Sequence, residues 1–166
     1  MLGHLARLSQ PTNSRTGLRR NWQRVPEERA AVSPTLLDSS FLIDLEREIE
    51  SGQAGPAISW LRRNRAYRDR ALLVPCVTVA EFLEGFEDIE RGLKFITRYV
   101  PQSIGFKQAR KCAELQRRRA NRAGRRYGEN DAWQLAFAEC AGAAIVARDR
   151  KAFAHLGNRY ERFDAA

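Results

Sequence analysis

Short apolar runs alternate with amphipathic segments from Pro34 to the end of the chain. The run at 71–76 is apolar throughout, which is typical of a strand buried on both faces of a sheet. The other runs have the length of strands and are bounded by turn residues or by helical patterns. On this basis we predict strands at residues 35–37, 71–76, 103–106, 143–147 and 160–163.

The segments between these runs place apolar residues three and four positions apart, as helices do. Four residues of the segment that begins at Asp131 share one helical face, which predicts that this face is buried; they are Trp133, Ala136, Phe137 and Cys140. Gly142 is expected to end this helix. Earlier helices are predicted at 40–51, from 56, at 78–86, around 89–96 and at 107–121. The alternation of strands with helices predicts an α/β fold, in which helices cover both faces of a mostly parallel sheet.

The first 33 residues lack this periodicity. Residues 1–26 contain five arginines and no acid. Because such a segment can bury little apolar surface, we predict a basic, disordered N-terminal tail at 1–33, followed by one domain at 34–166. A transit peptide or a start codon assigned too far upstream would have the same composition. Whether residues 1–33 belong to the native protein is therefore left open.

The whole chain of 166 residues carries a formal net charge of +9. Such an excess favours a polyanionic partner whose binding weakens as salt rises. Within the predicted domain, the positive charge is densest just before Asp131, at Arg117, Arg118, Arg119, Arg122, Arg125 and Arg126. These arginines are candidates for contact with RNA, although a solvated helix end would have the same composition.

The sequence gives no sign of export or of membrane insertion. No apolar run is long enough to cross a bilayer, and the N-terminus lacks the continuous apolar block of a secretory signal, so we expect a cytoplasmic protein. Cys76, Cys112 and Cys140 are widely spaced within apolar segments. This spacing predicts reduced thiols in the core and argues against a disulfide framework.

Four acids stand out by their positions. Asp38, Glu81 and Asp149 each follow a predicted strand, and the carboxyl ends of parallel strands share the sheet edge at which ligands bind. Asp131 begins the helix that leads into the last of those strands. Each acid also has an ordinary explanation, because three of them suit helix N-termini and Glu81 completes a capping box with Thr78. Their combination nevertheless predicts that the four carboxylates converge.

Converging carboxylates repel one another by about 4 kcal/mol per pair at roughly 4 Å, if the effective dielectric constant is about 20. A bound cation would relieve this repulsion. Oxygen ligands select a hard ion, Mg²⁺ or Mn²⁺, whereas the presence of only two histidines and the absence of paired cysteines argue against zinc.

Other phosphate chemistries fit the sequence less well. Ser40 occupies the position at which phosphatases of the haloacid dehalogenase type have a second Asp. The chain has no Gly-x-x-x-x-Gly-Lys loop, which argues against nucleotide hydrolysis. Only His155 lies within the predicted domain, so a serine nucleophile has no evident base.

Four stretches, taken in order, resemble the motifs of PIN-domain ribonucleases, most closely those of the VapC toxins of bacterial and archaeal toxin–antitoxin pairs. These stretches are Leu36–Ile43, Val77–Phe82, Asn130–Ala136 and Val146–Phe153. Each motif is weak alone, but their order and their strand and helix context match over residues 35–163. The resemblance implies a PIN-like three-layer α/β/α fold around a mostly parallel sheet of about four to five strands.

The resemblance also implies a Mg²⁺- or Mn²⁺-dependent endoribonuclease, with an acidic quartet of Asp38, Glu81, Asp131 and Asp149. The expected metal ligands among these are Asp38 and Asp131. The other two acids would hold the metal directly or through water. Three neighbouring residues would support the site, namely Ser40, Asn130 and Glu129.

By family likeness we further expect a homodimer and a cognate antitoxin whose C-terminal segment fills a groove. The apolar and acidic surface of residues 41–61 and 82–96 is the candidate for both contacts. Two alternatives stay open: a PIN nuclease that processes RNA outside toxin systems, and a basic RNA-binding module whose acids serve only as helix caps.

Overall fold

The structure is a computed structural model that describes residues 33–64 and 71–165. Almost all of the tail predicted at 1–33 therefore lies outside the described residues. The described strands form one sheet in the order β3-β2-β1-β4-β5, and every neighbouring pair is parallel. The strands are β1 (Thr35–Leu37), β2 (Leu72–Pro75), β3 (Val100–Gln102), β4 (Ala144–Ala147) and β5 (Tyr160–Arg162).

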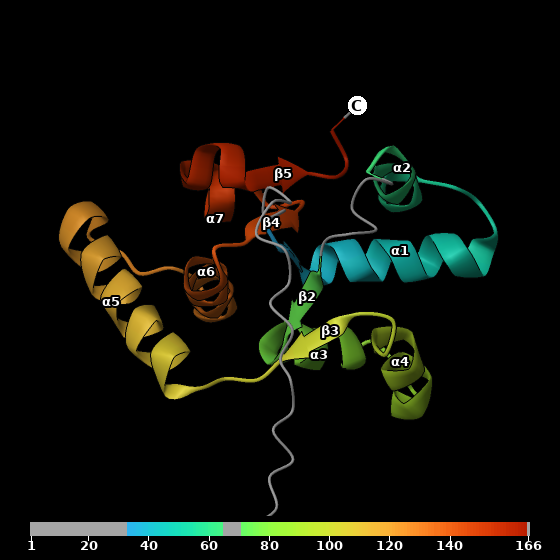
Figure 1. The fold of residues 1–166 in the computed structure, drawn as a ribbon, viewed down its shortest axis with the longest axis horizontal. Helices are drawn as coiled ribbons and strands as arrows, with labels where there is room; N and C mark the ends of the chain where they lie inside the picture. The colour runs from blue at the N-terminus through green and yellow to red at the C-terminus, as the bar shows by residue number, and fades with distance from the viewer. Residues whose placement is uncertain (1–32, 65–70, 166) are drawn as a thin grey trace, which may run out of the picture. The chain divides into compact units, whose positions relative to one another are not determined.

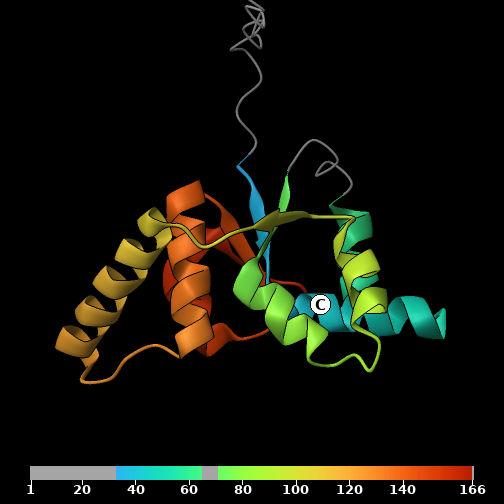
Figure 2. The same cartoon turned by 90° about the horizontal axis from the view of Figure 1, so that it is seen from below.

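Helices cover both faces of this sheet (Figures 1 and 2). One face is covered by α1 (Ser39–Ser51), α2 (Pro56–Arg63), α3 (Cys76–Leu83) and α4 (Ile89–Ile96). The other is covered by α5 (Phe106–Ala123), α6 (Glu129–Ala141) and α7 (Arg150–Phe153), which continues into the 3₁₀ segment η2 (Ala154–Arg159). The predicted α/β/α fold with a parallel sheet is confirmed.

The two faces of the sheet form separate parts of the core, because successive side chains of a strand point to opposite sides. In β1, Leu36 packs with residues of α5 and α6, while Leu37 packs with residues of α1 and α2. Both leucines are fully buried. The two consecutive leucines of β1 fit this burial on both sides of the sheet.

The strand predicted at 103–106 is wrong. Residues 103–105 form no strand, and Phe106 begins α5 with 85% of its surface exposed. The edge strand is instead β3, which includes Pro101 and pairs with β2. Proline is tolerated here because an edge strand needs hydrogen bonds on one side only.

Helix ends follow local chemistry that the sequence partly reveals. Gly142 ends α6 in the left-handed conformation at φ 62°, as predicted. The start of α2 is held from a distance, because the Glu48 carboxylate of α1 accepts hydrogen bonds from the backbone amides of Gly55, Ala57 and Ile58.

The three cysteines are free thiols, and Cys112 is buried. None of the helices in the described residues combines the length and apolar character that crossing a membrane requires.

Candidate active site

The predicted acids lie at the carboxyl edge of the sheet. Asp38 directly follows β1, Glu81 lies in the helix that follows β2, and Asp149 stands just beyond β4. Asp131 lies in the first turn of α6. Figure 2 shows the starts of α1 and α6 near the carboxyl end of the strands, although the two helices cover opposite faces of the sheet. We call these four residues the acid site.

Asp38 is the buried member of the acid site, with 8% of its surface exposed. Its Oδ2 atom accepts hydrogen bonds from the backbone amide and the hydroxyl of Ser40, so that it caps α1. Its Oδ1 atom accepts one from Gln134 Nε2 at 2.6 Å. The Ser40 hydroxyl in turn accepts from the backbone amide of Arg148 at 3.2 Å. The orientation of Asp38 is therefore set by α1, α6 and the end of β4.

Glu81 is held by the residue that precedes Asp131. Asn130 Nδ2 donates to Glu81 Oε1, while Glu81 Oε2 is buried and has no hydrogen-bond partner in the structure. The capping box considered for Glu81 and Thr78 does not form, because α3 begins at Cys76 and Thr78 lies inside the helix. Glu81 thus has one carboxylate oxygen that no donor within residues 33–64 and 71–165 satisfies.

Asp149 is exposed and caps α7, where its Oδ1 accepts from the backbone amides of Lys151 at 2.6 Å and Ala152 at 3.3 Å. Asp149 is therefore a helix cap, which is the ordinary explanation that its sequence position offers. Its Oδ2 is not used in these capping bonds.

Asp131 is the residue on which the charges of the other three acids act. Burial, followed by the negative charges of Asp149, Asp38 and Glu81, raises the pKa of the Asp131 carboxyl above its usual range. A Cβ atom on Gly128 would lie 2.7 Å from Asp131 Oδ2, so the carboxylate rests against a position that only glycine leaves open. The acid site is therefore a connected electrostatic unit.

The donor set fits a hard divalent cation. It consists of carboxylate oxygens, includes the unpartnered Glu81 Oε2, and carries mutual repulsion that a cation would relieve. Over residues 33–64 and 71–165, no three His, Cys, Asp or Glu side chains are gathered as a ready-made metal site. The carboxylates instead turn toward protein donors such as Ser40, Gln134 and Asn130.

Glu129, predicted as a supporting residue, makes no hydrogen bond to the acid site among the described residues. It is exposed at the start of α6, and its charge acts on the Cys112 thiol of α5, whose pKa is raised by burial and by Glu129. It is not among the carboxylates that raise the pKa of Asp131.

Gln134 is a site residue that sequence reasoning missed. It is 1% exposed and lies three positions after Asp131, so both side chains face the carboxyl edge of the sheet. The sequence did contain a sign of this role, because Gln134 is the one polar residue between Ala132 and Ala138. The single buried face predicted for α6 hid this signal, because α6 lies between the sheet and α5 and is buried on most sides.

The six arginines singled out in the sequence lie on the last turns of α5 and in the loop after it. Figure 2 places this end of α5 on the same side of the sheet as the start of α6. Arg119 is partly buried, and its guanidinium carbon lies 5.0 Å from the centre of the Tyr127 ring. The others are exposed.

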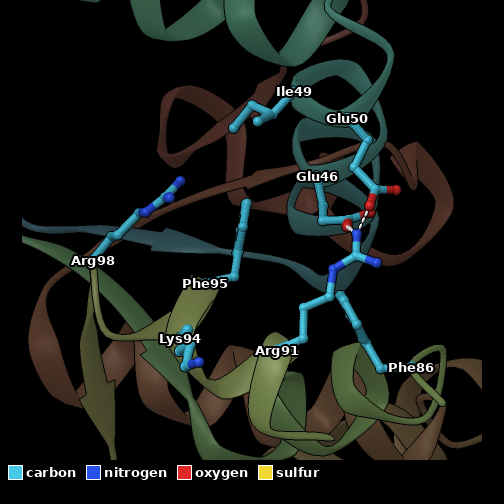
Figure 3. Close-up of a pocket in the computed structure, with 8 residues that line it drawn as sticks. All are labelled: Glu46, Ile49, Glu50, Phe86, Arg91, Lys94, Phe95 and Arg98. Atoms are coloured by element: carbon cyan, nitrogen blue, oxygen red, sulfur yellow. Dashed lines mark hydrogen bonds and ion pairs between the residues drawn. The ribbon is translucent and has the colours of Figure 1, made fainter. Parts of the chain in front are cut away.

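A separate groove lies between α1 and the α3–α4 region, within the surface predicted for protein contacts. Its hollow of about 260 Å³ has Phe86, Phe95 and the 47%-exposed Ile49 on its walls (Figure 3). Arg91 bridges its rim by ion pairs with Glu46 and Glu50. The groove is thus apolar inside and charged at its edge.

Comparison with solved structures identifies similar folds at low sequence identity. A chain of a toxin–antitoxin complex from Klebsiella pneumoniae matches with a TM-score of 0.59 and 18% identity, over 78% of this chain and 97% of its own length. VapBC-1 from nontypeable Haemophilus influenzae matches with a TM-score of 0.61 and 16% identity, over 79% and 98%. DNA-bound VapBC from Salmonella typhimurium matches with a TM-score of 0.59 and 19% identity, over 79% of this chain and 98% of its own length.

A sequence search among curated proteins finds no match. The family model of the PIN domain, however, matches residues 35–158, a range that includes every strand except β5 and all four members of the acid site. With this match, the parallel sheet and the acids at its carboxyl edge, the chain belongs to the PIN-domain family.

Proposed function

We propose that the protein is a Mg²⁺- or Mn²⁺-dependent endoribonuclease that acts as the VapC-like toxin of a toxin–antitoxin pair. PIN domains are generally nucleases, and the family match includes the acid site. The observation that carries the proposal is the position of the four acids at the carboxyl edge of the sheet, within the range that the family model matches. Burial and the charges of the three other carboxylates, which raise the pKa of Asp131, agree with this arrangement.

Asp38 and Asp131 would hold the cation, while Glu81 and Asp149 would hold it directly or through water. The cation, when bound, supplies the Lewis acidity that an attack of water on a phosphodiester requires. Ser40 and Gln134 keep the Asp38 carboxylate in place, and Asn130 does the same for Glu81. The expected products carry a 5′-phosphate and a 3′-hydroxyl.

The direct test is RNA cleavage by Asp38→Asn and Asp131→Asn, with the new 5′ ends mapped by sequencing. Both variants should lose cleavage at the sites that the wild type cuts. Glu129→Gln is the matched control, because it removes an exposed carboxylate two residues from Asp131 that is not among the charges raising the pKa of Asp131. Full activity in either Asp variant would refute the assignment.

Metal binding separates this proposal from a basic RNA-binding module without catalysis. Calorimetry with Mn²⁺ should give a binding isotherm for the wild type and a much weaker one for Asp38→Asn. If the wild type bound no Mn²⁺, the acids would be helix caps and the enzymatic proposal would fail.

The toxin assignment draws on the names of the structural neighbours, which include VapBC and toxin–antitoxin complexes. We place the antitoxin segment in the α1–α4 groove, where an apolar side chain would contact Phe86, Phe95 and Ile49 and charged ones would meet the rim. A PIN nuclease of RNA processing is the alternative.

Growth assays distinguish the two, because expression of a toxin in the cytoplasm should arrest growth and co-expression of a small protein encoded beside it should restore growth. An Ile49→Arg variant should remain toxic but escape this rescue. A homodimer is expected in solution, and light scattering would test it.

A further inference from the structure

A cavity of about 260 Å³ lies between the second half of α5, the loop before α6, and η2. Its walls combine three arginines with a tyrosine and a histidine, and we call it the arginine cavity: Arg118, Arg119, Arg122, Tyr127 and His155. It lies outside the acid site, and none of the roles proposed above uses Tyr127 or His155.

The positive charge of the arginine cavity is not neutralised by the neighbouring protein. In the first half of α5, Arg110 pairs with Glu114 at 3.0 Å and Lys111 pairs with Glu139 at 3.3 Å. Arg118 and Arg122, by contrast, pair with no acid among the described residues. The one carboxylate on the cavity wall, Glu139, is already taken by Lys111.

Arg119 adds an unsatisfied donor to this charge. Its Nε atom is buried and finds no hydrogen-bond partner among the described residues. Because buried polar groups are nearly always paired in folded proteins, this donor is suited to an acceptor supplied by a ligand. A phosphate oxygen is the acceptor that guanidinium groups match best.

Aromatic stacking fixes the side chains that face Arg119. Its guanidinium lies over the Tyr127 ring, and the Tyr127 and His155 rings stack at 5.5 Å with 30° between their planes. Tyr127 Oη and His155 Nε2 are 3.3 Å apart. The Gln116 amide holds the backbone of Tyr127 by two further hydrogen bonds. The cavity is therefore shaped before a ligand arrives.

The arginine cavity adjoins the acid site along the chain. Tyr127 is followed by Gly128, which abuts the carboxylate of Asp131. His155 stands in η2, directly after the helix that Asp149 caps. The last turns of α5 and the start of α6 lie on the same side of the sheet in Figure 2. A strand of nucleic acid in the acid site would thus pass close to the cavity.

We propose that the arginine cavity binds a backbone phosphate of the RNA strand, one or more nucleotides away from the bond that is cut. Arg118 and Arg122 supply the charge and Arg119 Nε supplies a fixed donor. The inference rests on the proposed ribonuclease function. It selects three of the six arginines singled out in the sequence, and it adds Tyr127 and His155 as residues that position Arg119.

The first test measures the affinity for a short fluorescent single-stranded RNA over a range of salt concentrations, in EDTA so that no cleavage occurs. The Arg118→Ala/Arg122→Ala variant should bind about tenfold or more weakly and lose about 0.7 from the salt slope, because one phosphate contact on a single strand contributes about 0.7. Lys107→Ala/Arg110→Ala removes the same charge from the other half of α5. It should leave the slope unchanged. Equal changes in both variants would overturn the proposal, since only overall charge would then matter.

The second test uses the imidazole signals of His155. Burial and then the charge of Arg119 lower the pKa of His155, while Glu139 raises it and Arg159 lowers it further. A phosphate in the cavity would offset the arginine charge, so RNA should raise the pKa of His155 measured by NMR, and the Arg118→Ala/Arg122→Ala variant should lose this response. The chain has two histidines, and His4→Gln assigns the signals. An unmoved His155 signal at saturating RNA would overturn the proposal.

Cleavage assays in Mn²⁺ on the same samples keep the two proposals separate. Binding that depends on the arginine cavity without cleavage would remove the ribonuclease function but leave the phosphate site standing. If the wild type cleaved RNA but the Arg118→Ala/Arg122→Ala variant bound RNA equally well, the phosphate site would be refuted and the ribonuclease function would stand.

Discussion

The acid site and the arginine cavity carry opposite charges and are assembled differently. They adjoin at two consecutive residues, because Tyr127 lines the cavity and Gly128 abuts the Asp131 carboxylate. The acids come from four elements spread over more than 100 residues of chain, and protein donors such as Ser40 and Gln134 hold them. The arginines come from neighbouring turns of one helix, and no acid of the described chain pairs with Arg118 or Arg122.

This difference matches the two proposed roles, which are cleavage at the acid site and phosphate binding in the arginine cavity. A carboxylate cluster for catalysis needs exact positions, which only the crossing of several elements can provide, and its repulsion must be countered. A phosphate contact needs available charge and a long side chain, which a single helix end can present. The predictions below separate the two regions, beginning with the largest effect.

Removal of divalent cations should separate the regions most clearly. With EDTA, cleavage should fall by more than about 1000-fold, a loss larger than that expected from removing one active-site donor. RNA affinity should change by about twofold or less, because phosphate contacts by arginine need no metal. Gel assays and fluorescence anisotropy on the same samples measure both. Loss of binding together with cleavage would mean that the two regions are one site.

Gly128→Ala should damage the acid site alone. The new Cβ would meet Asp131 Oδ2 at 2.7 Å, and displacement of a reacting group by about 1 Å can cost about 100-fold in rate. Gly105→Ala is the matched control, since Gly105 precedes α5 as Gly128 precedes α6 and its Cβ would meet only the flexible end of Gln108. Steady-state cleavage rates test the pair. Equal rates for wild type and Gly128→Ala would show that the Asp131 carboxylate has room to move.

Two glutamines hold the two regions through hydrogen bonds, Gln134 in the acid site and Gln116 beside the arginine cavity, so each can be perturbed separately. Gln134→Leu removes a buried donor from Asp38, which should lower the free energy of unfolding by about 1–3 kcal/mol and reduce cleavage. Gln116→Leu releases the backbone of Tyr127 and should cost about 1 kcal/mol, weakening RNA binding more than the rate at saturating RNA. Urea unfolding and a comparison of KM with kcat measure these effects. The same kinetic pattern in both variants would contradict the two separate roles.

The smallest effect concerns the metal-free stability of the acid site. Because the folded-state pKa of Asp131 is raised, the unfolded chain ionises first, so stability should fall as pH rises from the usual Asp pKa through the raised one. Asp131→Asn should flatten this dependence and stabilise the metal-free protein at neutral pH by a few tenths to about 1 kcal/mol, since solvent screens a half-buried carboxylate. Asp38→Asn should instead destabilise, because an amide nitrogen would replace one of the two carboxylate oxygens that accept from Ser40 and Gln134. Thermal unfolding in EDTA would measure both, and a lower midpoint for Asp131→Asn would argue against repulsion at this site.

Much of the fold was readable from local patterns. Apolar residues in runs of strand length predicted β1, β2 and β4, because burial on both faces favours continuous apolar strands. The strand predicted at 160–163 is also present as β5, although this edge strand is only partly buried. The edge strand β3 was misplaced, because an edge strand is half exposed and contains Pro101, so its sequence carries little periodicity.

The sequence by itself determined that Asp38, Glu81 and Asp149 follow strands and that the charge of the chain is concentrated in a few stretches, since these properties depend on order along the chain alone. Only the tertiary structure decided that Gln134 holds Asp38, and that Tyr127 stacks on His155 and lies under the Arg119 guanidinium. Such contacts depend on how helices cross and on which faces they bury. A linear pattern cannot specify them, because many packings satisfy the same periodicity.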